Sequence, residues 1–289
     1  MAEIITSAQN PKIKKLLALQ QKSSERRESG LFVVEGVREL QHCIEAGYEV
    51  DTVFLLSSGS WSSERVDMHP CRWEGPTEWE GSCPSEFQFP GGSGIARGVR
   101  VYEVSPAVYE KIAYRGSTEG VIAEVKAKSR NLSDLKLGGT PLVVVLESVE
   151  KPGNLGAVLR SADAAGADAV IICDPLTDLY NPNLIRASIG GIFSVPCVAC
   201  SSEEAIAFFK KNGIQILTAQ LQDSSLYYDY DMKKGSAIVM GTESTGLTDV
   251  WREAADAHIR IPMLGKLDSL NVSVSAAILL FEAVRQRNG

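Results

Sequence analysis

The chain has 289 residues, which is enough for two domains, and its 44% hydrophobic and 22% charged content is typical of a soluble globular protein. No apolar run is long enough to span a bilayer, and the first nine residues lack the basic start and apolar core of a signal peptide. We therefore expect a cytoplasmic protein whose six cysteines are reduced. The formal net charge of −7 counts only weakly against a nucleic-acid partner, because the distribution of charge matters more than its sum.

Basic residues crowd near the N-terminus, with Glu25 as the one acid between Lys12 and Arg27. The cluster consists of Lys12, Lys14, Lys15, Lys22, Arg26 and Arg27. Such a cluster can follow a phosphate backbone, and it can equally be the solvated face of a helix. The charges alone leave both interpretations open.

The first part of the chain alternates helix-like and strand-like patterns, which predicts a small α/β domain. The expected elements are a helix around Ile13 to Leu19, a strand over 31–34, a helix from Val37 to Glu45, and strands over 53–56, 99–104 and 120–125.

Residues 57–98 differ in character, since they are rich in Ser, Gly, Pro and Trp, and we predict an irregular insertion there. His69, Cys71 and Cys83 could supply three zinc ligands within it, but their spacing is irregular. We therefore predict no metal site.

From Pro141 onward, short strands that are apolar throughout alternate with helices, after a polar linker expected over 131–140. We expect strands over 142–146, 169–173, 214–218, 237–240 and 258–261, and helices over 154–165, 183–189, 203–211 and 271–287. This pattern predicts a parallel sheet covered on both faces.

Two further features of this half are explained by packing alone. The final helix is apolar nearly all round over its first half, which predicts that it is buried on all sides, in a deep core or a subunit interface. Cys197 and Cys200 form a CxxC in a strand-like run, and we interpret them as buried thiols rather than as a redox site.

Three segments carry candidate chemistry, because each lies where an apolar strand ends or leads into the next helix. They are residues 151–162, 238–247 and 261–275. In the first, Gly153 and Gly156 allow close backbone approach, Asn154 can cap a helix, and the planar cation of Arg160 suits a phosphate.

In the second segment, Gly241 and Gly246 flank Glu243 and allow a tight loop that presents one carboxylate. In the third, Ser269 or Asn271 can cap the final helix. Each of these side chains also has an ordinary structural explanation, as a cap, a surface cation or a loop acid. Their order and spacing together favour a single functional site.

The combination of Asn-x-Gly-x-x-x-Arg, Gly-x-Glu-x-x-Gly and Ile-Pro-Met followed by Ser-Leu-Asn-Val-Ser resembles the signature of the SpoU/TrmH RNA ribose methyltransferases of the SPOUT superfamily. The resemblance covers about Leu142 to Gln286, with Ser275 where alanine is expected. Residues 10–36 resemble the substrate-binding domain of that family, in a shorter and less specific match. Residues 57–98 do not fit its pattern.

The resemblance implies an α/β protein with a smaller N-terminal α/β RNA substrate-binding domain over 1–130 and a methyltransferase domain over 141–289. In that family the C-terminal parallel sheet contains a trefoil knot, the knot holds S-adenosylmethionine, and the chain dimerises through this domain. By position, the residues that would line the cofactor pocket are Thr218, Ala219, Met240, Gly241, Ile261, Met263, Leu270 and Asn271.

The resemblance also implies roles in catalysis. Because the pKa of an arginine lies above about 12, we expect Arg160 to act chiefly as a cation that stabilises the developing oxyanion. Asn154 would position the ribose or Arg160, Glu243 would orient the arginine or its own loop, and Ser269 and Asn271 would shape the third loop. The expected RNA-binding cations are Lys12, Lys14, Lys15, Arg26 and Arg27.

We therefore expect methylation of a ribose 2′-hydroxyl, with ribosomal RNA favoured because of the size of the N-terminal domain. The alternatives are a transfer-RNA ribose methyltransferase, a base methyltransferase of the same superfamily, and a non-catalytic RNA-binding assembly factor.

Overall fold

The structure of the protein is a computed structural model, and it describes residues 4–57, 86–88, 95–114, 120–242 and 244–289. The chain divides into two compact units. Unit 1 comprises residues 1–128 and 180–186, and unit 2 comprises residues 129–179 and 187–289.

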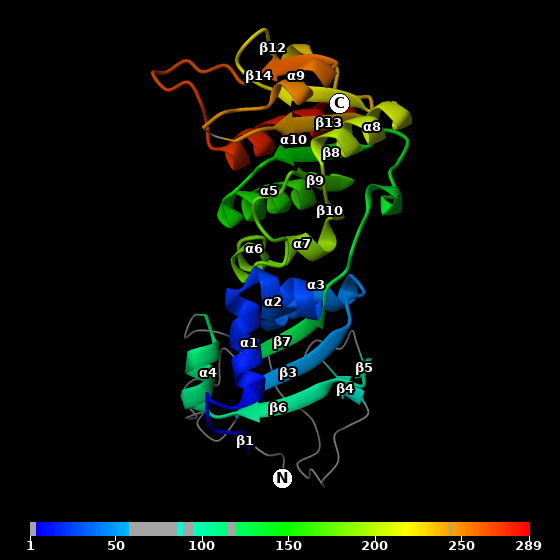
Figure 1. The fold of residues 1–289 in the computed structure, drawn as a ribbon. Helices are drawn as coiled ribbons and strands as arrows, with labels where there is room; N and C mark the ends of the chain where they lie inside the picture. The colour runs from blue at the N-terminus through cyan, green and yellow to red at the C-terminus, as the bar shows by residue number, and fades with distance from the viewer. Residues whose placement is uncertain (1–3, 58–85, 89–94, 115–119, 243) are drawn as a thin grey trace. The chain divides into compact units, whose positions relative to one another are not determined.

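Unit 1 is built on a five-stranded mixed sheet with the strand order β1-β6-β3-β7-β2 (Figure 1). Its strands are β1 (Ile4–Ile5), β2 (Leu31–Glu35), β3 (Val50–Leu56), β6 (Arg100–Val104) and β7 (Val121–Lys126). Its helices include α1 (Pro11–Gln21), α2 (Ser23–Ser29), α3 (Val37–Glu45) and α4 (Pro106–Ile112). A short antiparallel pair, β4 (Glu86–Gln88) and β5 (Ile95–Arg97), lies in the region predicted as an irregular insertion.

The core of unit 1 forms where α1 and α4 pack on one face of this sheet. Ile13, Leu16 and Leu19 follow helical spacing and are fully buried, which confirms the predicted first helix. The predicted strands and the helix α3 are also confirmed. The helix α2 was not predicted, because its sequence, Ser-Ser-Glu-Arg-Arg-Glu-Ser, carries no apolar periodicity.

A short segment from much later in the chain belongs to unit 1. The ring of Tyr180 stacks on Phe32 with 4.3 Å between the ring centroids. Its hydroxyl accepts from the backbone N–H of Lys128 at 2.9 Å and donates to the carbonyl of the same residue at 2.7 Å. These contacts explain why residues 180–186, which include most of α6 (Pro182–Ala187), cluster with this unit.

Unit 2 contains a seven-stranded sheet in which every neighbouring pair is parallel, in the order β10-β9-β8-β13-β11-β14-β12. The strands are β8 (Leu142–Glu147), β9 (Ala169–Cys173), β10 (Cys197–Cys200), β11 (Gln215–Ala219), β12 (Ser225–Leu226), β13 (Ser236–Met240) and β14 (Ala257–Arg260). The prediction of a parallel α/β sheet is confirmed.

Helices cover both faces of this sheet (Figure 1). They are α5 (Pro152–Ala164), α7 (Gly191–Ser194), α8 (Ser202–Asn212), α9 (Asp249–Ala254) and α10 (Val272–Asn288). The helices α8 and α9 pack on one face, where Phe209 and Trp251 are fully buried. The helices α5 and α10 contact each other and the strands β9, β8 and β13.

Residues expected to form a linker contribute to the core of unit 2. A 3-10 turn, η3 (Leu132–Asp134), lies within residues 131–140, and Leu132, Leu135 and Leu137 pack against the buried cluster beneath α8 and α9. A second 3-10 turn, η4 (Tyr227–Asp229), follows β12.

One local prediction was wrong, and another is narrowed. The helix α5 begins at Pro152, so Asn154 lies inside its first turn and does not cap it. Proline at the first helical position supplies a favourable φ, which explains the earlier start. In the single chain the helix α10 is not buried on all sides, because Val274 and Phe281 are 46% and 48% exposed; of the two predicted environments, this counts against a deep core and leaves the subunit interface.

The CxxC cysteines lie in β10, in the sheet. Burial raises the pKa of Cys197 to about 12, so this thiol stays protonated at neutral pH. Cys200 is opposite Cys173 of β9 in the strand register, and all the described cysteines are free thiols. Cys197 therefore serves as a small buried apolar residue, as predicted.

Candidate active site

A cavity of about 380 Å³ opens at the carboxyl ends of β11, β13 and β14. Its lining comes from the residues that follow β11, from the second motif segment and from the third. Of the eight predicted cofactor residues, those that line it are Ala219, Met240, Gly241, Ile261, Met263 and Leu270. Ligands of parallel α/β sheets bind at this edge, so the position fits a binding site.

The other two predicted cofactor residues do not line this cavity. Thr218 is fully buried, and its hydroxyl lies 2.6 Å from Nδ1 of His258 on the neighbouring strand. The sequence placed it correctly at the end of β11 but could not show which way its side chain points, because strand residues alternate between faces. Asn271 instead joins the third segment to the first.

The second motif segment forms a tight loop that is braced by its own atoms. The backbones of Thr242 and Gly246 exchange hydrogen bonds at 3.2 and 3.1 Å. The hydroxyl of Thr242 also lies 2.7 Å from that of Thr245 and accepts from its N–H. A Cβ on Gly241 would lie 2.2 Å from the carbonyl oxygen of Gly246, so only glycine fits there. The predicted carboxylate of this loop, Glu243, lies outside the described residues.

The third segment is an extended, exposed loop that ends at the cap of α10. Ser269 and Asp268 both line the cavity, and the hydroxyl of Ser269 donates to Oδ1 of Asp268 at 3.2 Å. Oδ1 of Asn271 accepts from the backbone N–H of Ser273 at 3.0 Å, which confirms Asn271 as the N-cap.

One hydrogen bond joins the first motif segment to the third. Nδ2 of Asn271 donates to Oδ1 of Asn154 at 3.2 Å. The bond connects the first turn of α5 with the first turn of α10, two helices that pack together. It therefore brings together two of the predicted catalytic side chains.

Arg160 lies further along α5, and its side chain is exposed. It does not line the cavity, and within the described parts of the chain the structure gives its guanidinium no ion-pair partner. An exposed, uncompensated guanidinium suits contact with a polyanion. The guanidinium of Arg160 is therefore open to solvent and does not hold a ligand inside the cavity.

Several cavity residues escaped sequence reasoning. Gln220, Leu221 and Gln222 follow β11, and Arg252 and Arg260 come from α9 and β14. Only their position along the chain could have indicated them, since the residues that follow a parallel strand lie at the ligand-binding edge of the sheet. None of these residues belongs to a recognisable motif, so the sequence alone did not single them out.

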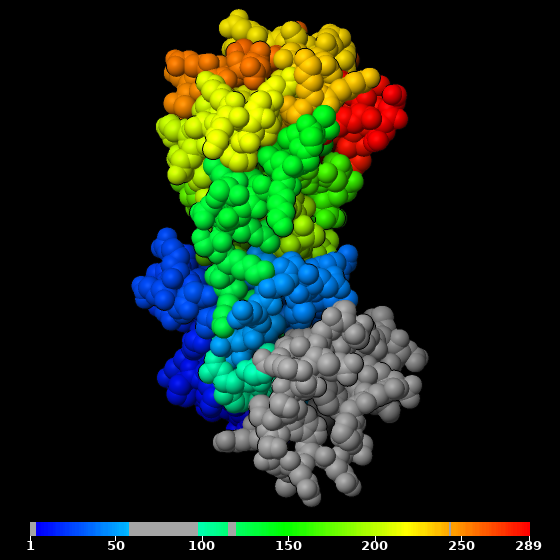
Figure 2. Space-filling view, turned by 90° about the vertical axis from the view of Figure 1, so that its right-hand side faces the viewer, coloured from blue at the N-terminus to red at the C-terminus, as the bar shows by residue number. Residues whose placement is uncertain are grey.

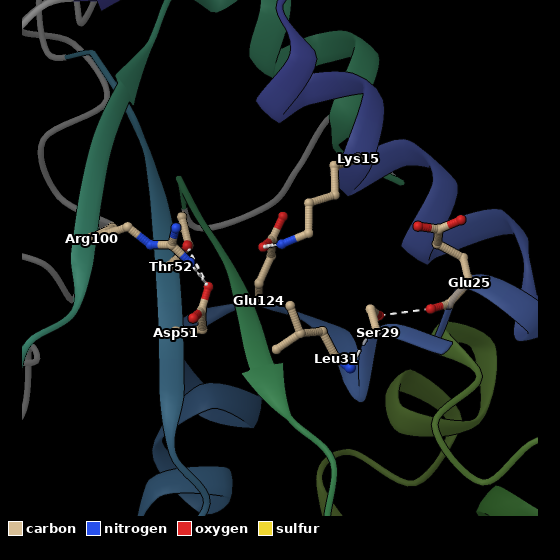
Figure 3. A network of polar contacts seen from close by, with 8 residues as sticks. All are labelled: Lys15, Glu25, Ser29, Leu31, Asp51, Thr52, Arg100 and Glu124. Carbon is tan, nitrogen blue, oxygen red and sulfur yellow. Dashed lines mark hydrogen bonds and ion pairs between the residues drawn. The ribbon is translucent and has the colours of Figure 1, made fainter. Parts of the chain in front are cut away.

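The predicted RNA-binding cations of unit 1 have different surroundings. Lys15 of α1 forms an ion pair with the buried carboxyl group of Glu124 at 2.7 Å (Figure 3). Burial raises the pKa of Glu124, and Lys15 opposes that shift. Lys12 lies over the ring of Tyr102, with 4.7 Å from its ammonium to the ring centroid. Lys14 is exposed.

Arg26 requires a correction. Its side chain is 6% exposed and donates to the carbonyl oxygens of Leu19 at 2.6 Å and Gln20 at 3.3 Å. Those carbonyls belong to the last turn of α1, which has no further helical partners for them. Arg26 therefore closes the end of α1, whereas its neighbour Arg27 is exposed. We remove Arg26 from the candidate RNA surface.

Among the described residues, no three side chains of His, Cys, Asp or Glu are grouped as a metal site would need. The candidate zinc ligands His69, Cys71 and Cys83 lie outside those residues. No helix in the described ranges combines the length and apolar character needed to cross a membrane.

Comparison with known proteins gives two family matches. Residues 141–281 match the SpoU rRNA Methylase family, and residues 10–123 match the MRM3-like substrate binding domain. The chain is 36% identical to the 23S rRNA (guanosine-2′-O-)-methyltransferase RlmB of Ralstonia nicotianae, over 67% of this chain and 80% of that protein. It is 31% identical to the 23S rRNA (adenosine(1067)-2′-O)-methyltransferase of Streptomyces azureus, over 98% of this chain and 96% of that protein.

A solved structure extends the likeness to the fold. The AdoMet-bound rRNA methyltransferase from Sinorhizobium meliloti superposes with a TM-score of 0.80 and 28% identity, covering 98% of this chain and 97% of that one. The likeness therefore includes both units.

Proposed function

This chain belongs to the SpoU rRNA methylase family, and we propose that it transfers a methyl group from S-adenosylmethionine to a ribose 2′-hydroxyl of ribosomal RNA. The observation that carries this proposal is the joining of the three motif segments. The second and third segments line one cavity, and the Asn154–Asn271 hydrogen bond ties the first to the third.

The cavity fits S-adenosylmethionine in size and in chemistry. Its volume of about 380 Å³ falls within the usual range for small-molecule sites. Met240, Ile261 and Leu270 offer apolar contact for an adenine ring, while Asp268 and Arg252 offer charges for an amino-acid moiety. The close approach of Gly241 and Gly246 leaves backbone groups beside the cavity.

The bound cofactor supplies an electrophilic sulfonium methyl, and the protein must align a ribose oxygen with it and manage one proton. The Arg160 guanidinium would hold a neighbouring phosphate and stabilise the oxyanion as it develops. Asn154, held by Asn271, would position the ribose or Arg160. Ser269 would shape the third loop through Asp268, and Glu243 would orient the arginine or its own loop.

The C-terminal domain over 141–289 would be knotted and dimeric. The packing of α10 against α5 and against the central strands β8 and β13 supports a chain end threaded back through the domain. Val274 and Phe281 are seven residues apart, so they lie on one face of α10, and both are about half exposed. An apolar face of this kind supports a second copy of the chain as the partner.

The N-terminal domain over 1–130 would bind RNA, with residues 131–140 leading into the catalytic domain. Lys12, Lys14, Lys15 and Arg27 remain the candidate phosphate contacts. Ribosomal RNA is favoured because two relatives, one matched over 96% of its length and the other over 80%, act on 23S rRNA by name. We propose that the protein acts in the cytoplasm.

The test is to incubate the protein with labelled S-adenosylmethionine and separated ribosomal and transfer RNA, followed by alkaline digestion. A 2′-O-methyl group blocks cleavage at the next phosphodiester, so we expect label in alkali-resistant dinucleotides from ribosomal RNA. Label in mononucleotides would indicate base methylation, and label in the transfer-RNA pool would indicate the other substrate. Binding of RNA with no transfer of label to either pool would favour an assembly factor.

A further inference from the structure

The last residue of β8 has an unusual environment. Glu147 is 3% exposed, and both of its carboxyl oxygens accept hydrogen bonds from one residue, Thr248. Oε2 accepts from the Thr248 backbone N–H at 2.9 Å, and Oε1 accepts from its hydroxyl at 2.6 Å. Neither residue belongs to the three motifs.

Thr248 directly follows the second motif segment. It follows Leu247, which is 4% exposed and lines the cavity, and it is the N-cap of α9. Its own side chain caps nothing in α9, and its hydroxyl donates to Glu147. The bond to Glu147 therefore fixes the place where the loop meets the helix.

The loop between these points is braced by its own described residues, because Thr242 and Gly246 exchange backbone hydrogen bonds and Thr242 also holds Thr245. Such a loop takes its position from its two ends. One end continues from Met240 of β13, which pairs with Leu146 of β8. The other end is Thr248, which is held by Glu147. Glu147 follows Leu146 directly in β8.

We propose that Glu147 is a positioning residue for the cofactor, acting through Thr248 to hold the second motif loop against the cavity. The inference rests on the proposed function. Both ends of the loop are held against β8, the strand that leads into the first motif segment. Glu147 therefore sets the second loop relative to the segment that carries Asn154 and Arg160.

The same strand offers a matched control at its other end. Oδ2 of Asp168 accepts from the backbone N–H of Leu142, the first residue of β8, at 2.8 Å. This bond also ties a carboxyl group to a backbone N–H, but it lies at the edge of the sheet opposite the cavity. Removing it should affect folding without affecting the loop.

The experiment titrates S-adenosylhomocysteine into the full-length wild type and the variants E147A, E147Q, T248V and D168A by calorimetry, and measures the melting temperature of each. Because E147A removes both acceptors of Thr248 and so releases this end of the loop, we expect its Kd to rise about tenfold. T248V keeps the backbone donor and should raise the Kd about threefold. E147Q keeps one acceptor and should fall between E147A and the wild type.

D168A should lower the melting temperature while leaving the Kd within about twofold of the wild type, since the lost bond lies far from the loop. The double variant E147A/T248V should bind no more weakly than E147A alone, because both substitutions break the same Glu147–Thr248 contact. If E147A does not fold, T248V and E147Q carry the comparison.

Wild-type affinity in T248V and E147Q, or an equal loss of affinity in D168A at matched melting temperature, would overturn the inference. Failure of the wild type to bind S-adenosylhomocysteine would instead overturn the proposed function, and the inference with it.

Discussion

Nδ2 of Asn271 donates a hydrogen bond to Oδ1 of Asn154, and these two residues lie 117 positions apart in the chain. The bond links the first turns of α5 and α10 at the edge of the site. Asn271 has a second task, because its Oδ1 accepts from the N–H and the hydroxyl of Ser273 and so caps α10. Capping and joining can therefore be separated by substitution.

We expect Asn271→Ala to lower the free energy of unfolding by about 1 kcal/mol, because it removes the cap. Asn271→Ser keeps a capping oxygen and should stay within a few tenths of a kcal/mol of the wild type. Both variants lack the amide that donates to Asn154, so both should lose methyl transfer about tenfold. Urea denaturation and single-turnover assays measure the two effects. Full activity in Asn271→Ser would show that the joining bond has no catalytic role.

Arg160 is exposed and makes no contact with the cavity, so its loss should leave the fold and the cofactor site intact. We expect Arg160→Ala to slow methyl transfer by about 100-fold or more, the usual effect of removing a group that stabilises a developing oxyanion. Arg160→Lys keeps the charge but not the planar fork, and should recover only part of the rate. Near-normal turnover in Arg160→Ala, with unchanged S-adenosylhomocysteine affinity, would exclude the assignment.

We expect substitution of Gly241 to disturb the cofactor site by a steric clash. A Cβ there would lie 2.2 Å from the carbonyl oxygen of Gly246, so Gly241→Ala should push the second loop out of place and abolish measurable cofactor binding. Gly153→Ala is the control, because a Cβ at Gly153 meets nothing within 4 Å and alanine favours a helix. It should keep the affinity and raise the unfolding free energy by up to about 1 kcal/mol. Equal affinity in the two variants, measured by calorimetry, would contradict the loop geometry.

The fold of unit 2 could be predicted because its strands are apolar throughout and its helices have clear bounds. The strand Ala169–Cys173 was placed to the residue, and Asn271 was among the two expected caps. Short elements such as α9 and β12 escaped, because a helix of six residues and a strand of two carry too few residues for a periodic signal.

The sequence predicted a site residue correctly where its position along the backbone was enough to place it at the cavity. It failed where the outcome depended on the direction in which the side chain points. Ala219 and Met240 line the cavity because they end neighbouring strands. Thr218 points to His258 instead, and Arg26 turns back to the end of α1, although both lay in the expected segments. The Glu147–Thr248 pair spans 101 residues, and no local pattern indicates it.

We expect the stability of the protein to depend on pH through the buried thiol of Cys197. Burial raises its pKa from 9.0 in the unfolded chain to about 12 in the fold. The folded state therefore holds this proton more tightly, and the stabilisation is fully present below pH 9.0 and is lost as the pH rises toward about 12. Above pH 9.0 the unfolding free energy of the wild type should fall more steeply than that of Cys197→Ala, by up to about 1.4 kcal/mol per pH unit. Parallel pH profiles from urea denaturation would contradict the burial of this thiol.

Arg26 and Arg27 are adjacent in the chain but have opposite surroundings, so they separate folding from RNA binding. Arg27→Ala removes an exposed cation, and we expect weaker binding to ribosomal RNA fragments and a salt dependence whose slope is shallower by about 0.7, the value for one contact to a single strand. Arg26→Ala leaves the carbonyls of Leu19 and Gln20 without their donor, so it should cost about 1 to 3 kcal/mol of stability. Its salt slope should match that of the wild type, because a buried guanidinium releases no counterions. Fluorescence anisotropy at several salt concentrations distinguishes the two residues. A shallower slope in Arg26→Ala, or an unchanged slope in Arg27→Ala, would place the RNA surface elsewhere on unit 1.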